Sequence, residues 1–199
     1  MTRKVVILTL ILFAVVAAGG FYIFRLLKRR AAASSAVSER LARTRLTEAA
    51  LQPPGAAASN VQLYFPSFPD GKLVSETRSI KLAATDTDRI RQVLLALIEG
   101  SHQGRSPALP PSTTIRGVFL TADGAAYIDF SGKSLAAFDS GIESETLSIY
   151  SIVDSLAANV PDVKQVKFLV DGQEVETLDG HVNLTGFFVP DLSLIESGP

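Results

Sequence analysis

The pattern of hydrophobic residues is most regular between residues 141 and 161, where it follows the period of an α-helix. Five apolar residues fall at positions i, i+3, i+4, i+7 and i+11 and therefore share one face: Ile149, Ile152, Val153, Leu156 and Val160. Small polar residues fill the opposite side. Pro161 ends the pattern, because proline lacks an N–H group and disfavours a helical conformation in the residue before it. A helix with one apolar face predicts a sheet against which that face packs.

A second apolar stripe predicts another helix, which begins near Thr85 or Asp86 and stops at Gly100. Thr and Asp are favoured at the start of a helix, and glycine is common after its end. The residues of the stripe are Ile90, Val93, Leu94, Leu97 and Ile98. The segment that follows, residues 101–112, is rich in Gly, Pro and Ser and contains His102. It is predicted to be an irregular loop and a candidate contact surface.

Alternating apolar residues predict strands in hairpin-like pairs. Residues 61–66 and 72–82 flank a short, turn-rich loop. Residues 113–121 and 125–131 flank an Asp-Gly dipeptide and are rich in β-branched and aromatic side chains. Each pair is predicted to form two neighbouring antiparallel strands.

A third pair is predicted to start at Val163 and to turn at Asp171-Gly172, a dipeptide typical of a type I′ turn. The order of elements is then β-β-α-β-β-α-β-β. This order favours an α+β fold, a two-layer sandwich of one mostly antiparallel sheet with two helices on one face.

The twenty residues from Val5 to Phe24 carry no charge and are long enough to cross about 30 Å of hydrocarbon. They predict an uncleaved transmembrane helix; the alternative is a cleaved signal peptide, for which the small residues at 17–20 are suited. The predicted organisation is an anchor with basic flanks (1–30), a juxtamembrane and partly helical linker (31–59), a globular domain (60–190) and a frayed tail (191–199).

Charge divides the chain into a basic and an acidic part. Residues 1–60 carry nine Lys/Arg and two Asp/Glu, whereas residues 61–199 carry ten and eighteen. The basic residues after Phe24 would by themselves place the C-terminal side in the cytoplasm. An acidic globular part offers no footprint for a phosphate backbone, so nucleic acid is not an expected partner. The chain has no cysteine, which excludes disulfides, thiolate metal sites and lipid-modified cysteines.

Several charged residues invite a chemical interpretation, and a structural role competes with each. Glu76 and Arg78 share one face of a predicted strand, where an ion pair is expected. Asp129 and Glu145 are the carboxylates nearest to a pair, but a turn and a helix N-terminus explain them without chemistry. The two histidines, His102 and His181, lack the spaced ligands of a metal site, and no metal or cofactor is predicted.

A Ser151-Asp171-His181 triad can also be written from the sequence. Ser151 lies inside the predicted helix, and no nucleophile elbow or donor-rich turn surrounds it. His181 is then expected to tether a loop. A hydrolase remains the remote alternative.

Residues 61–181 also carry a series of short motifs that resemble the GerMN domain of sporulation and spore-germination proteins. The motifs occur in the order of that family: LVSETRSIKL (73–82), VLLALIEG (93–100), the approach to a strand at 110–115, AYIDFS (126–131), Gly141 with Glu145, SIVDSL (151–156), NVP (159–161), FLVDG (168–172) and LDGH (178–181). The residues that form this structural signature are Glu76, Arg78, Gly100, Asp129, Glu145, Pro161, Asp171, Gly172, Gly180 and His181.

The resemblance implies a noncatalytic, extracytoplasmic module, similar to the small ring-building domains of sporulation and secretion assemblies. The chain differs from the sporulation members in having one copy and no lipobox cysteine. We therefore expect a single-pass membrane protein of the bacterial cell envelope that binds another protein or itself. A module that binds envelope glycan or a small ligand is the alternative. The candidate interaction face is the polar side of the second helix: Ser148, Ser151, Asp154, Ser155 and Ala158.

Overall fold

The computed structural model describes residues 58–135, 141–178 and 180–196. The predicted anchor and nearly all of the predicted linker lie outside these residues. Among the helices that the model describes, none is long and apolar enough to cross a membrane. The region that resembles the GerMN domain is therefore the part whose architecture can be compared with the predictions.

The first sheet has two strands, β1 (Ser59–Ser67) and β2 (Lys72–Ile80), which pair antiparallel without a register shift. Side chains alternate between the two faces of this sheet. The core face of β1 carries three fully buried apolar residues: Val61, Leu63 and Phe65. On β2 the same face carries Glu76 and Arg78, which lie opposite Leu63 and Val61. The predicted hairpin is confirmed, and its inner face holds two buried charges.

The helix α2 (Asp86–Glu99) begins and ends at the residues that the sequence predicts. Thr85 is its N-cap, and its hydroxyl accepts a hydrogen bond from the N–H group of Asp88 at 3.2 Å. Gly100 follows its last turn with φ of 92°, a backbone conformation that favours glycine. The predicted apolar stripe of this helix is buried.

The second sheet contains β3 (Ile115–Leu120), β4 (Ala125–Phe130) and β5 (Gln165–Val170), in that order. β3 and β4 form the predicted antiparallel pair, whereas β5 runs parallel to β4. Between β4 and β5 the chain forms the short helix α3 (Gly132–Leu135) and the long helix α4 (Ile142–Asn159). Eighteen helical residues carry the chain back along the sheet, so that β5 enters from the same end as β4.

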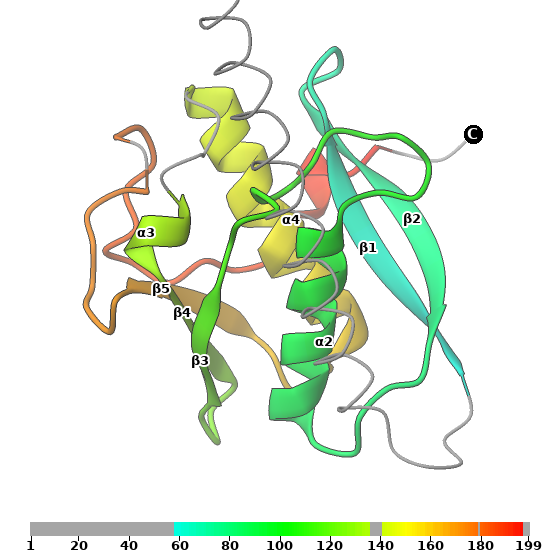
Figure 1. Ribbon diagram of the computed structural model, residues 1–199, viewed down its shortest axis with the longest axis horizontal. Coiled ribbons are helices and arrows are strands. Elements are labelled where there is room, and N and C mark those ends of the chain that lie inside the picture. The colour runs from blue at the N-terminus through cyan, green and yellow to red at the C-terminus, as the bar shows by residue number, and fades with distance from the viewer. Residues whose placement is uncertain (1–57, 136–140, 179, 197–199) are drawn as a thin grey trace, which may run out of the picture. The chain divides into compact units, whose positions relative to one another are not determined.

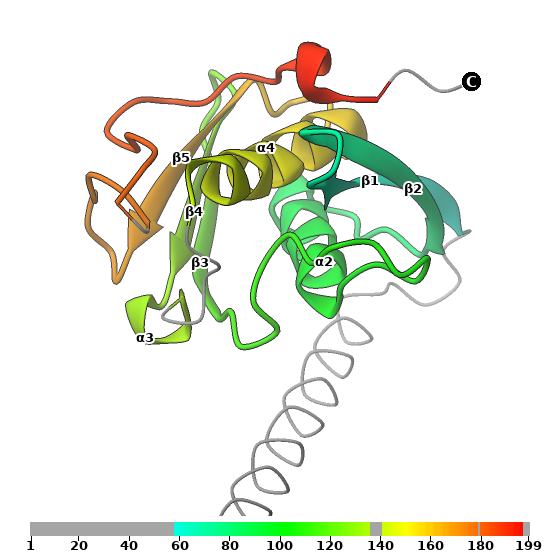
Figure 2. The same ribbon diagram turned by 90° about the horizontal axis from the view of Figure 1, so that it is seen from above.

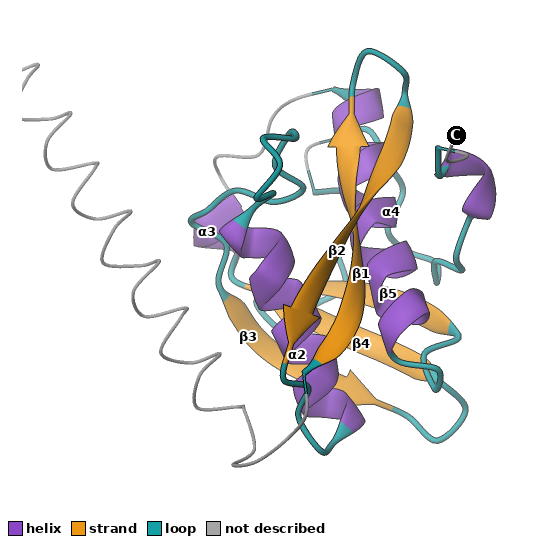
Figure 3. Cartoon of the chain, turned by 90° about the vertical axis from the view of Figure 1, so that its right-hand side faces the viewer, coloured by secondary structure: helices purple, strands orange, loops and turns teal. Residues whose placement is uncertain are grey.

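The prediction of one sheet with both helices on one face is wrong. The strands form two separate sheets, and α2 and α4 lie between them (Figures 1 and 2). Figure 3 looks onto β1 and β2, with the helices and then the three-stranded sheet behind them. The coarser prediction of an α+β domain with two main helices is confirmed. A helix that packs between two sheets is buried on two sides. Its apolar stripe marks only one of these sides, so the hydrophobic pattern does not reveal the second sheet.

The third predicted hairpin forms its turn but not its second strand. Asp171 and Gly172 have φ of 52° and 80°, the two positive values that a type I′ turn requires. Val170 and Gln173 then exchange two backbone hydrogen bonds, of 2.9 and 3.1 Å, and the pairing stops there. Besides β4, β5 pairs with Phe188 rather than with a second hairpin strand. Phe188 exchanges two hydrogen bonds of 2.8 Å with Val166.

The described part of the predicted tail, residues 191–196, contacts the rest of the domain. Leu192–Leu194 forms the 3-10 helix η1, and Asp191 caps it by accepting from the N–H group of Ser193. Glu196 then donates its N–H to the carbonyl of Leu73 at 2.8 Å. This C-terminal segment therefore covers the beginning of β2.

Candidate functional site

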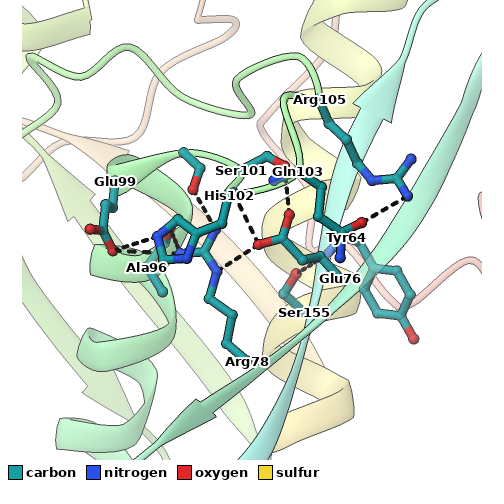
Figure 4. Close-up of polar contacts among 11 residues, drawn as sticks. Tyr64, Glu76, Arg78, Ala96, Glu99, Ser101, His102, Gln103, Arg105 and Ser155 are labelled. Atoms are coloured by element: carbon teal, nitrogen blue, oxygen red, sulfur yellow. Dashed lines mark hydrogen bonds and ion pairs between the residues drawn. The ribbon is translucent and has the colours of Figure 1, made fainter.

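The guanidinium of Arg78 is buried and projects from β2 toward the C-terminal end of α2 (Figure 4). Its Nε lies 2.7 Å from Glu76 Oε1, and its Nη1 donates to the carbonyl of Ala96 at 3.3 Å. Its Nη2 donates to the carbonyl of Gly100. Glu99 lies 3.5 Å from Nη1. Because the last turn of α2 has no basic residue, Arg78 supplies the positive charge that favours a helix C-terminus.

The Glu76 carboxylate is held from the other side by the loop after α2. The Ser101 hydroxyl donates to Oε2 at 2.5 Å, and the N–H group of His102 donates to Oε1 at 3.2 Å. Burial by itself would raise the pKa of Glu76, but the hydrogen bonds from Ser101, Arg78 and His102 and the charge of Arg78 lower it to about 2. The ion pair that the spacing predicts is thus the centre of a larger network, which fixes β2 to α2.

An open pocket of about 390 Å³ lies beside this network, along the C-terminal half of β2. Its lining residues are Thr77, Arg78, Ser79, Ile80, Glu99 and His102. His102 is 61% exposed, and its Nε2 lies 3.6 Å from Glu99. The loop that the sequence singles out as a contact surface therefore contributes His102 to a pocket wall.

The predicted interaction face on α4 is, for the most part, not a surface. Ser148, Ser151, Asp154 and Ser155 are buried, and only Ala158 of the predicted set is exposed. The Ser151 hydroxyl donates to the carbonyl of Tyr64, and the Ser155 hydroxyl accepts from the N–H group of Tyr64 at 3.0 Å. These side chains are small because β1 approaches the helix closely. The prediction of an outer face is wrong at these four positions.

Asn159 completes this contact; it lies in the NVP motif (159–161), but the sequence pattern predicts no role for it. Its Oδ1 accepts from the N–H group of Gln62 at 2.9 Å, and its Nδ2 donates to the carbonyl of the same residue. Ser151, Ser155 and Asn159 are spaced by four residues, so they lie on one side of α4. That spacing was available in the sequence, but the partner, an unpaired strand edge, was not.

Asp154 lies on the same helix in a less satisfied environment. Its Oδ1 accepts from the N–H group of Asp191 at 2.9 Å, while Oδ2 is buried without a hydrogen-bond partner. Burial raises the pKa of Asp154 to about 6; the Asp191 N–H group opposes this, and the Asp191 charge adds to it. Burial, together with the charge of Asp154, also raises the pKa of Tyr64. Asp154 is therefore a buried acid whose protonation changes near pH 6.

Glu145 is fully buried and holds the loop residues Leu178, His181 and Val182, which precede Phe188 in the chain. It accepts from the N–H groups of Leu178 at 2.8 Å, His181 at 3.0 Å and Val182 at 3.2 Å. His181 Nδ1 lies 3.4 Å from the same carboxylate. Beyond its place in the first turn of α4, Glu145 therefore holds the loop that contains His181.

Asp129 and Asp171 meet at the end of the second sheet. Asp129 accepts from the N–H group of Gly172 at 2.9 Å, which holds the type I′ turn against β4. Arg116 on β3 lies 2.9 Å from Asp171 and 3.6 Å from Asp129. Asp171 also accepts from the N–H group of Gly132. Both acids therefore connect strand ends and turns.

The hypothetical catalytic triad is not assembled. Ser151 binds Tyr64, Asp171 binds Arg116, and His181 lies against Glu145, so the three side chains have three different partners. Within the described ranges, no group of three or more His, Asp or Glu side chains is placed to hold a metal ion.

Comparison with solved structures places this arrangement among known folds. The chain is 21% identical to the tandem GerMN domains of the sporulation protein GerM from Bacillus subtilis, over 65% of this chain and 45% of that one, with a TM-score of 0.51. It is 20% identical to the first GerMN domain of that protein, over 64% of this chain and 94% of the other, with a TM-score of 0.49. A candidate lipoprotein from Clostridium perfringens is 22% identical, over 67% and 88% of the two chains, with a TM-score of 0.48.

The similarity to the tandem domains shows a shared fold. Among proteins of curated function, none matches the chain. The family model called Germane, described as sporulation and spore germination, matches residues 62–176. Because this match covers more than half of the sequence, the chain belongs to the GerMN (Germane) family.

Proposed function

We propose that this protein is a membrane-tethered, extracytoplasmic protein-interaction module of the bacterial cell envelope, with a scaffolding role related to sporulation or germination and without catalysis. The observation that carries the proposal is how the conspicuous polar side chains are used. Glu76, Arg78, Glu145 and Asp129 each bind partners inside the domain. A domain whose charged side chains hold its own elements together is suited to presenting a fixed surface.

The tether is the predicted span from Val5 to Phe24, and the external location follows the family resemblance. A reporter that is active only outside the cytoplasm, fused to the C-terminal end, should be active in cells. A matched reporter that works only in the cytoplasm should be silent in the same fusion. The opposite pair of results would favour the orientation that the basic residues after the span predict.

The interaction itself is tested by crosslinking the full chain in native membranes and identifying its neighbours by mass spectrometry. A defined envelope protein, or a second copy of the chain, should be recovered reproducibly. A chain that yields no protein neighbour from any surface position would overturn the proposal.

The pocket lined by Arg78, Glu99 and His102 favours a second candidate function, the binding of envelope glycan or a small ligand. Its polar walls match the hydroxyl groups of a sugar. The test is retention of the detergent-solubilised full chain on purified cell wall. Retention that His102→Ala reduces would favour this candidate, whereas no retention would remove it.

A further inference from the structure

We propose that the open edge of β2, from Ser75 to Ser79, accepts an extended segment of a partner polypeptide as a third strand, with a basic side chain of that segment over the adjoining pocket. This inference rests on the proposed function, since it specifies where and how the module binds a protein.

The direction of the backbone groups on β2 follows from the contacts of β1. The N–H and C=O groups of Gln62 and Tyr64 bind side chains of α4, so they point away from β2. Their register partners are Thr77 and Ser75. In an antiparallel pair, residues opposite such positions also point away from the shared ladder, so Thr77 and Ser75 face outward. Ser79, two residues further on, does the same.

Leu73 confirms this direction, because its outward carbonyl accepts from the N–H group of Glu196 at 2.8 Å. The C-terminal segment thus occupies the edge at Leu73. In the described part of the chain, no backbone hydrogen bond reaches the outward groups of Ser75, Thr77 or Ser79. In Figure 1, β2 forms the outer margin of its sheet, with β1 on its other side.

The edge also lacks the features by which proteins prevent strand addition. Ser75, Thr77 and Ser79 are exposed, small and uncharged, and the β1–β2 register contains no bulge. The edge strand of the other sheet, β3, differs in both respects. It has a register shift between Ile115 and Gly117 and carries the charged Arg116 between them. Of these two edges, β2 is the one suited to pairing with another chain.

The pocket determines which side chain the added strand should bring. A strand beside β2 places alternate side chains on the core side of the sheet, where Arg78, Glu99 and His102 line the pocket. Among the residues that the structure describes, Glu76 and Glu99 place two carboxylates beside the guanidinium of Arg78. The acidic balance of residues 61–199 has the same sign. Charge complementarity therefore favours Lys or Arg, which would join the existing network.

Amide hydrogen exchange of the full chain in detergent tests whether the edge is open. The amides of Ser75, Thr77 and Ser79 should exchange at least roughly tenfold faster than those of Glu76 and Arg78, which bond to β1. Equal protection of all five amides would mean that the edge is already covered, and it would overturn the proposal.

A photocrosslinking residue in place of Ser79 in native membranes tests the occupant. The expected adduct is a single partner polypeptide, joined through a segment with Lys or Arg within two residues of the crosslink. Thr77→Lys should reduce this adduct about tenfold, because a charge at the edge prevents the loss of water that strand pairing needs. Thr114→Lys, which changes another exposed threonine, should leave the adduct unchanged. Melting temperatures establish that both variants are folded, and Thr77→Arg, which also places a charge at the edge, replaces Thr77→Lys if that variant is not.

The outcomes separate this inference from the proposed function. Protein adducts from other surface positions but none from Ser79 would overturn the β2 site and leave the interaction module intact. A second copy of this chain, or lipid, at Ser79 would also overturn the site as described. An adduct that Thr77→Lys and Thr114→Lys reduce equally would show contact without strand addition and would likewise overturn it. Only the absence of protein adducts at every position tested would remove the proposed function itself.

Discussion

Glu76 and Asp154 are both acidic side chains with 2% of their surface exposed, yet their environments are opposite. Glu76 accepts hydrogen bonds from Ser101, His102 and Arg78. Asp154 accepts one, from the backbone of Asp191, and its second oxygen has no hydrogen-bond partner. The pKa is about 2 for Glu76 and about 6 for Asp154. Burial raises the pKa of both carboxyl groups, and the hydrogen bonds from Ser101, Arg78 and His102, with the charge of Arg78, reverse this effect at Glu76.

The difference also separates two kinds of connection. The Glu76 site fixes β2 to the end of α2 with a charge that persists at any physiological pH. The Asp154 site holds the C-terminal segment against α4 through an acid whose charge changes near neutral pH. Both sites border β2, since Glu196 of the C-terminal segment pairs with Leu73. Replacing each acid in turn and measuring stability therefore tests how firmly β2 is held.

The largest effect is expected for Glu76→Gln. The amide keeps the shape of the side chain but leaves the buried Arg78 without its closest counter-charge, which costs about 3–5 kcal/mol. Urea unfolding at pH 7, followed by circular dichroism, measures this loss. The matched control is Glu99→Gln, because Glu99 is 19% exposed and 3.5 Å from Arg78, and it should cost less than half as much. Equal losses would mean that the Glu76 pair is not the centre of the network.

The two acids should also give opposite pH dependences. The pKa of Glu76 is lowered from 4.5, so its contribution to stability is complete above pH 4.5 and is lost as the pH falls toward 2. The pKa of Asp154 is raised from 3.8, so its contribution is complete below pH 3.8 and is lost as the pH rises through 6. Melting temperatures at pH 3, 5 and 7 should show wild type and Glu76→Gln converging at the acid end. Parallel curves would contradict the low pKa of Glu76.

The sequence was sufficient for most elements of this fold and insufficient for their assembly. Periodicity located α2 and α4 and four of the five strands as predicted pairs, and Thr85, Gly100 and the Asp171-Gly172 turn act as their residue types predict. These features depend on neighbours along the chain. The parallel placement of β5 and the division into two sheets depend on where α4 returns the chain, which no local pattern encodes.

The site shows the same limit in its side chains. Glu76 and Arg78 could be paired from the sequence because they are two residues apart on one strand. The sequence predicts an outer face for Ser151 and Ser155 because they lie opposite the apolar stripe of the helix. Their partner, the Tyr64 backbone, is 87 and 91 residues away. Hydrogen bonds from a helix to a strand edge can make polar residues as buried as apolar ones, and only the tertiary structure reveals them.

Asp154→Asn should have the opposite sign to Glu76→Gln. The amide removes a buried charge whose Oδ2 has no partner, while its oxygen can still accept from the Asp191 N–H group. The variant should be about 1–2 kcal/mol more stable than wild type at pH 8 and no more stable at pH 4, where wild type is also neutral. Urea unfolding at both pH values measures the difference. Asp162→Asn, an exposed change of the same kind, should have little effect at either pH, and a gain there equal to that of Asp154→Asn would assign the effect to net charge.

The smallest effect is expected for Asp191→Asn, which tests why the pKa of Asp154 is high. Burial is the main cause, and the charge of Asp191 adds to it, whereas the Asp191 N–H group acts in the opposite direction. Asparagine removes only the charge, because it keeps the N–H group and can still cap η1 through its side-chain oxygen. The pKa of Asp154 should therefore fall below about 6 but stay above 3.8. Carbon-detected NMR of the carboxyl resonance follows this titration, and an unchanged midpoint would leave burial as the only cause. A return to 3.8 would instead mean that the charge of Asp191, rather than the missing donor at Oδ2, distinguishes this acid from Glu76.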